Sequence, residues 1–166
     1  MNTDSYEGLS PNSALSAILL ESYRRLVGQQ LVPAGLDDVQ AARWLYEDAA
    51  CCILAHDAAA DPHFIYANKA AQHCFEYRWD EFTVLPSRLS AEAPNRAERQ
   101  DLLDRVARDG FARGYRGLRI SRSGRRFFIE DGTVWQLTDG HGALHGQGAM
   151  FPHWRDVTSV APADPK

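Results

Sequence analysis

Two histidines and a glutamine stand where a strand pattern places them beside bare backbone. His145 and Gln147 alternate with Gly146 and Gly148 along one expected strand, and His56 ends another. Glycines at alternate positions leave one strand face without side chains, so a ligand or another backbone can approach closely there. We therefore take His56, His145 and Gln147 as candidate ligand contacts. Packing of a helix on the bare face is the alternative.

Four aromatic residues are large enough to form the walls of a small-molecule pocket. They are Tyr66, Trp79, Phe82 and Trp135, three of which also carry a polar atom at the tip of the ring. The same residues would equally form an ordinary hydrophobic core.

Two further polar residues are candidate ligand contacts. Arg88 is expected in a loop over the cavity mouth, where it would bind an acidic ligand or pair with a carboxylate such as Glu81. Asn68 stands at the expected start of a short helix that borders the pocket.

The chain lacks the sequence signatures of common catalytic and metal sites. It contains no Gly-rich phosphate loop, nucleophile elbow, H-E-x-x-H or paired metal motif. His141 and His145 are four residues apart but span an expected turn, so we do not expect zinc. We predict a protein that is not an enzyme and has no catalytic or metal-binding residues.

An enzyme alternative comes from the order of the expected elements. Two helices, a hairpin, a helix and a meander also suit the cone-shaped α+β fold of the ketosteroid-isomerase and NTF2-like type, in which a cavity carboxylate acts as base. Asp48 or Asp57 would be that base, with a pKa raised by burial.

The composition is typical of one globular domain. The chain has 166 residues, of which 45% are apolar and 24% charged, and a formal net charge of −4. The longest apolar run, 49–55, is too short to cross a membrane, and the N-terminus does not have the pattern of a signal peptide. The 3 cysteines include no C-x-x-C pair, which fits a reducing compartment. We expect a cytoplasmic protein without membrane contact.

The basic residues are concentrated in one segment. Between Arg88 and Arg126 there are 11 arginines and 5 acidic residues, so the segment carries +6 and the rest of the chain −10. The arginines at 113, 116, 119, 122 and 125 recur every third residue, whereas strand side chains alternate every second residue. Consecutive arginines therefore fall on opposite faces, and we expect ion-paired or solvated arginines and no nucleic-acid binding.

Apolar periodicity and turn residues predict helices first and strands last. The expected elements are helices at 11–27 and from 37 or 38 to about 49, strands at 51–55 and 63–67, helices at 69–77 and 79–85, a helix ending at 110, and strands at 111–121, 125–137 and 145–151.

Several residues mark the expected helix ends. Ser10 precedes Pro11 at the start of the first helix, and Asn68 can cap the short helix after the hairpin. Asn95 has a glutamate three residues on, which predicts a capping box. Gly110 predicts a C-terminal cap.

A two-residue loop at Ser123-Gly124 would fix the register of the hairpin formed by the expected strands 111–121 and 125–137. Ile120 then lies opposite Phe127 on an apolar face, and Arg119 lies opposite Phe128 on the other face. Both faces of the sheet then need cover, from the middle helices on one side and from an N-terminal helix or a partner on the other.

Local motifs resemble those of PAS-type sensor domains. The run Tyr66-Ala67-Asn68-Lys69-Ala70-Ala71 resembles their strand-into-helix signature, and Trp154-Arg155-Asp156-Val157-Thr158 resembles the exit motif that leads towards an effector. More specifically, the chain resembles the MEKHLA domain family from about Leu15 to Phe151. This PAS-related group occurs at the C-terminus of some plant homeodomain–leucine zipper regulators and as free-standing bacterial proteins. The matching stretches are 66–71, 79–82, 85–91, 110–111, 114–115 with 117, 119–121, 124–130, 134–135 and 145–147.

The resemblance implies an α+β fold with a PAS-like five-stranded antiparallel sheet, short helices on one face and an N-terminal helical extension. It implies a sensory or protein-interaction role without an established ligand or reaction, so no catalytic residues are carried over. The expected ranges are a disordered tail at 1–10, the helical extension at 11–50, the PAS-like core at 51–159 and a disordered tail at 160–166.

Flavin and haem are cofactors of the PAS superfamily, and each would depend on one particular residue of this chain. LOV-type flavin chemistry needs a cysteine in a motif resembling Asn-Cys-Arg, whereas Cys74 stands in His73-Cys74-Phe75-Glu76, so flavin is disfavoured and Cys74 is expected in the core. His73 could be an axial haem ligand, but a lone helical histidine is weak evidence and haem is not expected. The cofactor stays unknown.

The first helix carries an apolar stripe formed by Leu15, Ile18, Leu19 and Leu26. This stripe either covers the sheet of its own chain or pairs with a second subunit. We expect a homodimer or a signalling partner protein.

Overall fold

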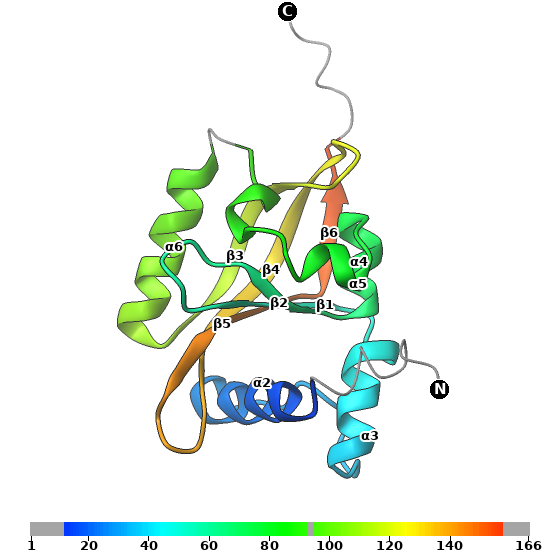
Figure 1. Ribbon diagram of the computed structural model, residues 1–166, viewed down its shortest axis with the longest axis vertical. Coiled ribbons are helices and arrows are strands. Elements are labelled where there is room, and N and C mark those ends of the chain that lie inside the picture. Colours follow the sequence, from blue (N-terminus) through cyan, green and yellow to red (C-terminus); the bar gives the residue numbers. More distant parts are fainter. Residues whose placement is uncertain (1–11, 93–94, 158–166) are drawn as a thin grey trace, which may run out of the picture.

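An antiparallel sheet of six strands lies at the centre of the structure, a computed structural model that describes residues 12–92 and 95–157 (Figure 1). Its spatial order is β2-β1-β5-β4-β3, and β6 pairs with β4. The strands are β1 Cys52–Asp57, β2 Phe64–Ala67, β3 Phe111–Ile120, β4 Arg126–Thr138, β5 Leu144–Phe151 and β6 His153–Asp156. The helices are α2 Asn12–Val27, α3 Asp38–Arg43, the π-helix η1 Trp44–Asp48, α4 Lys69–Phe75, α5 Trp79–Phe82, the 3-10 helix η2 Ser87–Ser90 and α6 Arg96–Asp109.

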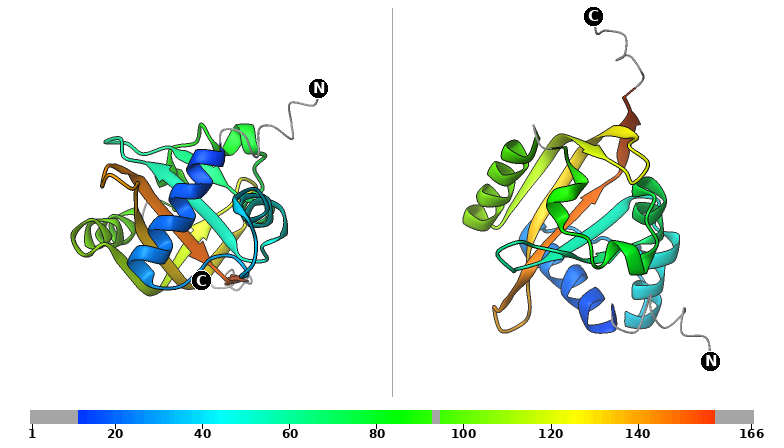
Figure 2. Two further views of the ribbon diagram at one scale, coloured as in Figure 1. Left: turned by 90° about the horizontal axis from the view of Figure 1, so that it is seen from below. Right: turned by 45° about the horizontal axis from the view of Figure 1, so that its top comes forward.

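Helices cover both faces of the sheet. α2 lies across one face, and the left view of Figure 2, seen from below, shows it crossing the strands. The shorter helices α4 and α5 and the longer α6 lie on the opposite side of the sheet (Figure 1). The α+β class and the order of elements predicted from the sequence are confirmed. None of the described helices is long and apolar enough to span a membrane.

The apolar stripe of α2 packs on the sheet of its own chain. Leu19 is fully buried, and the ring of Tyr23 meets that of Trp135 edge-on, with centroids 4.8 Å apart. Trp135 Nε1 also donates a hydrogen bond of 3.0 Å to Ser22 Oγ. The stripe was predicted either to cover the sheet of its own chain or to pair with a second subunit. In the structure it covers the sheet of its own chain.

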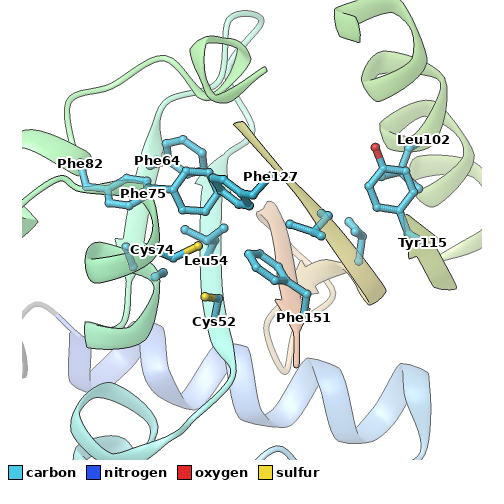
Figure 3. Close-up of a cluster of buried hydrophobic side chains, with 14 of the residues drawn as sticks. Cys52, Leu54, Phe64, Cys74, Phe75, Phe82, Leu102, Tyr115, Phe127 and Phe151 are labelled. Atoms are coloured by element: carbon cyan, nitrogen blue, oxygen red, sulfur yellow. The ribbon is translucent and has the colours of Figure 1, made fainter. Parts of the chain in front are cut away.

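The opposite face of the sheet holds a second apolar cluster. Figure 3 shows Phe75 of α4 and Phe82 of α5 beside Phe127 of β4, with Phe151 of β5 nearby. The Phe75 ring lies 5.1 Å from Phe127 and 5.6 Å from Phe82, both in edge-to-face geometry. Cys74 is buried in the same cluster, as predicted. The two faces are therefore packed by different helices.

Asn68 joins β1, β2 and α4 through hydrogen bonds of its side chain. Its Oδ1 accepts from Ile53 N and Ala71 N, each at 3.0 Å. Its Nδ2 donates to the carbonyl oxygens of Leu45 at 3.1 Å and Cys51 at 3.0 Å. Asn68 is fully buried, so these contacts use both of its amide donors and the carbonyl oxygen. The predicted cap is confirmed and also has a long-range role.

The other predicted caps have different outcomes. Asp37 starts α3 with a capping box, and Gly110 ends α6 with φ +97°. Asn95 makes no side-chain cap bond, so the predicted capping box there is wrong. Its φ of −102° and ψ of 2° depart from the extended conformation that aims an N-cap side chain at the first turn. The predicted start at Ser10 and Pro11 lies outside the described residues.

The register of the β3–β4 hairpin differs by one residue from the prediction. Ser121 N donates to Arg125 O at 2.9 Å and Gly124 N to Ser121 O at 3.0 Å, which makes a three-residue loop with Gly124 at φ +93°. Three-residue loops of this kind place glycine in the left-handed region. Arg119 therefore lies opposite Phe127, where the two-residue loop would have placed Ile120. This shift turns Arg119 into the core.

The outer face of this hairpin is covered by arginines. The Arg116 guanidinium lies 3.9 Å from the centre of the Phe128 ring and pairs with Glu130 at 3.5 Å. Arg155 of β6 also pairs with Glu130, at 3.1 Å. The sequence did not predict β6 as a strand, because Pro152 interrupts the pattern. Pro152 lies between β5 and β6, where a missing backbone donor breaks no ladder bond.

Two glycines of β5 allow close packing on the α2 side. A Cβ atom at Gly146 would lie 1.8 Å from the backbone oxygen of His56. A Cβ atom at Gly148 would lie 2.8 Å from the Trp135 ring. The predicted bare face is therefore filled by a neighbouring backbone and an aromatic ring of the same chain.

Candidate functional site

A small cavity lies between the sheet and α6. Its volume is about 60 Å³. Most of the wall is apolar and comes from Leu54, Phe64, Phe75, Leu102, Leu103, Ile129, Val134 and Phe151. The polar side chains of the wall are His56, Ser90, Arg99, Tyr115, Arg119 and Gln147.

Two of the polar groups that line the cavity, Arg99 and His56, are joined through the buried hydroxyl of Ser87. Arg99 Nη2 of α6 donates to Ser87 Oγ at 2.8 Å, and Ser87 Oγ lies 3.1 Å from His56 Nδ1. Because Ser87 Oγ accepts from Arg99, its own proton is available for His56 Nδ1. The proton of the neutral imidazole then belongs on Nε2.

A second pair of groups comes from alternate positions of β3. Arg119 Nη2 donates to the Tyr115 hydroxyl at 3.1 Å, and Arg119 Nη1 donates to Leu118 O at 2.8 Å. Gly117, between them, provides room for the tyrosine ring, since a Cβ atom there would lie 2.2 Å from the Tyr115 hydroxyl oxygen. The Tyr115 ring lies beside Leu102 of α6 in Figure 3. Tyr115 and Arg119 thus reach the cavity from one strand.

The cavity carries positive charge without a facing carboxylate. Arg99 is 8% exposed and Arg119 is 6% exposed. Burial and, secondly, the charge of Arg119 lower the pKa of Arg99 to about 10, so the Arg99 guanidinium group remains charged at neutral pH. Among the described residues, neither arginine has an ion-pair partner, and the side chains that line the cavity include no carboxylate.

His56 is neutral at physiological pH. Burial and, secondly, the Arg99 charge lower its pKa to about 4. Its cross-strand neighbour on β5 is Gln147. Gln147 Nε2 donates to Leu103 O at 3.1 Å and to Gln136 Oε1 at 2.9 Å, which ties β5 to α6. Gln147 Oε1 is buried and has no hydrogen-bond partner among the described residues.

Only two of the candidate contacts predicted from the sequence line the cavity, namely His56 and Gln147. Tyr66 and Trp135 are buried on the α2 side of the sheet, and half-buried Trp79 packs there, 5.8 Å from the Tyr66 ring. Phe82 is a buried core residue that does not line the cavity. These four aromatic residues form ordinary core, which was the alternative reading of them.

The remaining candidate contacts also lie elsewhere. Arg88 is exposed and pairs with Asp61 at 3.1 Å, not with Glu81. His145 lies at the start of β5 and pairs with Asp139 of the β4–β5 loop at 2.9 Å. His73 is exposed on α4, so it does not face the cavity as the haem hypothesis requires. Asn68, described above, has its donors and acceptor occupied by backbone groups.

Four polar residues that line the cavity were not predicted as site residues: Ser90, Arg99, Tyr115 and Arg119. Ser87, which bonds to Arg99 and His56, was not predicted either. Arg99 stands three residues before Leu102 and seven before Val106, both buried, so it shares the apolar stripe of α6. That spacing was a usable signal in the sequence. The position of Arg119 depended on the register of the hairpin, which the sequence pattern set wrongly.

The carboxylates of the enzyme alternative do not reach the cavity. Asp48 is exposed at the end of η1. Asp57 Oδ1 accepts from the backbone nitrogens of Ala59 at 3.2 Å and His63 at 3.1 Å, so it orders the β1–β2 turn. Neither aspartate lines the cavity, and the hypothesis of a cavity carboxylate base is not supported.

The arginine-rich segment is largely ion-paired. Arg122 pairs with Glu81 at 2.9 Å and Arg126 with Glu92 at 3.2 Å. Arg125 pairs with Glu76 and Asp156. These pairs follow the ion-paired arrangement expected from the sequence, whereas Arg99 and Arg119 are buried without an ion-pair partner among the described residues.

Comparison with solved structures defines the class of protein. A PAS domain from Colwellia psychrerythraea superposes with a TM-score of 0.61 at 14% identity, over 74% of this chain and 98% of that one. A light-oxygen-voltage domain studied with a flavin analogue gives a TM-score of 0.51 at 14% identity, over 66% and 79%. An RNA-binding light-oxygen-voltage receptor gives 0.59 at 23% identity, and the match spans 79% of this chain but only 35% of the receptor. The fold is that of a PAS domain.

The family follows from the sequence. The model of the MEKHLA domain matches residues 13–156, so the chain belongs to the MEKHLA domain family. No curated protein sequence matches the chain.

The cofactors of PAS-like proteins do not fit this cavity. An enclosed space of about 150 Å³ holds one benzene molecule, whereas this cavity measures about 60 Å³. The three-ring system of a flavin and the macrocycle of haem both exceed it. Cys74 is buried in the phenylalanine cluster and does not line the cavity.

Proposed function

We propose that this chain is a sensory domain that binds a small molecule in the cavity beneath α6 and signals through a partner protein or a second copy. The observation that carries the proposal is the buried polar cluster inside an otherwise apolar cavity. Buried polar groups cost free energy unless they are paired. A few polar groups converging in an apolar pocket are typical of ligand sites.

The cluster also offers a route for a signal. Its members belong to β1, η2, α6, β3 and β5. A ligand that contacts several of them interacts with elements far apart in the sequence, so its binding can favour one packing of α6 against the sheet. Such a change in packing would reach the outer surface of α6, where a partner could detect it.

Non-catalytic binding fits this cavity better than an enzymatic reaction. The lining offers two guanidinium groups, hydroxyl groups and the His56 imidazole, whose pKa of about 4 makes it a weak general base, and it includes no carboxylate among the described residues. A pure interaction module, with a cavity that stays empty, is the second candidate. The small cavity volume favours it over an enzyme.

Native mass spectrometry of freshly purified protein tests the proposal. We expect a mass above that of the chain by a few tens to about 90 daltons, corresponding to a ligand of a few carbon atoms in a cavity of about 60 Å³. The added mass should disappear after unfolding and refolding in ligand-free buffer. A chain mass without any adduct in repeated preparations would favour the pure interaction module.

Light scattering during size-exclusion chromatography tests the dimer. Because the stripe of α2 packs on its own sheet, a dimer would have to use another surface. A single species of monomer mass at all concentrations tested would leave a separate partner protein as the route of signalling.

A further inference from the structure

Two arginines deliver positive charge to the same small cavity from different elements. Arg99 comes from the inner stripe of α6 and Arg119 from the inner face of β3, and both line the cavity wall. They are 8% and 6% exposed. They are close enough for the charge of one to act on the other. Two buried like charges repel each other unless an anion lies between them.

The partners of these arginines within the chain are neutral. Arg99 donates to the Ser87 hydroxyl, and Arg119 donates to the Tyr115 hydroxyl and to the Leu118 carbonyl oxygen. A guanidinium group has five N–H donors. In the part of the chain that the structure describes, these three bonds are the ones that the two side chains make, so several donors remain available at the cavity.

The rest of the wall sets the nature of the anion. Leucine, isoleucine, valine and phenylalanine side chains surround the cavity away from the arginines. An inorganic ion such as phosphate would leave its other oxygens against these apolar groups, which is costly. An organic acid can place its carboxylate on the arginines and its hydrocarbon part on the apolar wall. The volume of about 60 Å³ limits it to a few carbon atoms.

We propose that the ligand of this cavity is a short-chain organic carboxylate, whose carboxylate group binds between Arg99 and Arg119 and whose hydrocarbon part contacts the apolar wall. This inference rests on the proposed function and specifies the ligand class for the same cavity. Planar guanidinium groups suit carboxylate oxygens and can bind them through paired hydrogen bonds.

Calorimetric titration of the purified chain with acetate, propionate, butyrate and isobutyrate tests the proposal. The matched neutral probes are propionamide and butyramide, and sodium chloride and phosphate at equal ionic strength are the inorganic probes. We expect saturable binding of at least one acid, and affinity lower by about tenfold or more for its amide, as for loss of a charge-assisted contact. Equal binding of acid and amide, or of acid and inorganic anion, would overturn the proposal.

Substitution of each arginine is the second test of the carboxylate proposal. Arg99→Met and Arg119→Met should each weaken binding of the acid by about tenfold or more. Arg105→Met changes an exposed arginine of the same helix and should leave the affinity unchanged. Without ligand, the first two variants should unfold at temperatures no lower than the wild type, because each removes a buried charge that has no counter-ion.

The results separate this inference from the proposed function. If no acid binds but native mass spectrometry finds a neutral adduct, the carboxylate inference is wrong and the sensory function stands. If no acid binds and no adduct is found, both are wrong. If either arginine variant fails to fold, the comparison of acid with amide on the wild-type chain still decides the question.

Discussion

Arg119 lies directly opposite Phe127 across the β3–β4 hairpin, so a charged side chain and a fully buried ring share the inner face of the sheet. This pairing exists because Gly124 adopts a positive φ and closes a three-residue loop. A loop one residue shorter would turn Arg119 to the outer face of the hairpin, where Arg116 pairs with Glu130. One backbone conformation thereby brings one of the two positive charges to the cavity.

Asn68 should be far more important for stability than Asn95, although both precede a helix. Asn68→Ala removes four hydrogen bonds to backbone groups of three other segments and of α4. We expect it to lower the free energy of unfolding by about 3 kcal/mol or more. Urea unfolding followed by circular dichroism measures the loss.

The matched control is Asn95→Ala. Asn95 makes no side-chain cap bond, and its replacement should cost less than about 0.5 kcal/mol. Similar losses for the two variants would contradict the role assigned to Asn68.

Gly146 should not tolerate a side chain. In Gly146→Ala the new Cβ atom would lie 1.8 Å from the His56 backbone oxygen, at a residue with φ +143°. Because β1 and β5 would have to separate, we expect a loss of about 3 kcal/mol or more in thermal or urea unfolding. Gly140→Ala is the control, since a Cβ atom there meets nothing within 4 Å. Equal stability of both variants would show that β1 and β5 are further apart than described.

Protonation of His56 should destabilise the fold as the pH falls. Its pKa is about 4 in the folded chain, compared with the usual 6.5 in the unfolded chain. Between these values the unfolded chain binds the proton more readily, so stability present above pH 6.5 is lost as the pH falls towards 4. The full loss is roughly 3 kcal/mol.

Urea unfolding of the wild type and of His56→Gln over this pH range measures the effect. The variant should lack most of this pH dependence, whereas His73→Gln, at an exposed position, should retain it. An identical pH dependence in wild type and His56→Gln would mean that His56 is not neutral in the folded chain.

The contact of α2 with the sheet should contribute substantially to stability. Leu19 is fully buried, and Leu19→Ala should lower the free energy of unfolding by about 2 to 5 kcal/mol through lost burial and the cavity left behind. Leu144→Ala, at a leucine that is 49% exposed, should cost less than about 1 kcal/mol. If Leu19→Ala instead changed the molar mass in solution and left stability unchanged, the stripe would be an interface between copies.

Sequence patterns were reliable where structure is decided locally. The Asn68 cap depends on one side chain and the backbone that follows it, and Gly110 could be assigned to a helix end because it tolerates positive φ. The order of helices and strands and the family motifs follow from spacing within short windows. These features therefore predicted the α+β class and the MEKHLA family before any contact was known.

The tertiary structure alone decided which residues meet at the cavity. Arg99 and Arg119 are twenty positions apart and lie on a helix and a strand, so no local period relates them. A change of one residue in a strand register moves every side chain to the other face. For this reason Arg119, predicted on the face opposite to Phe127, lies on the same face as Phe127. The sequence by itself determined the elements and their family. Packing of α6 against β3 and β4 determined that two positive charges, His56 and Gln147 face one small cavity.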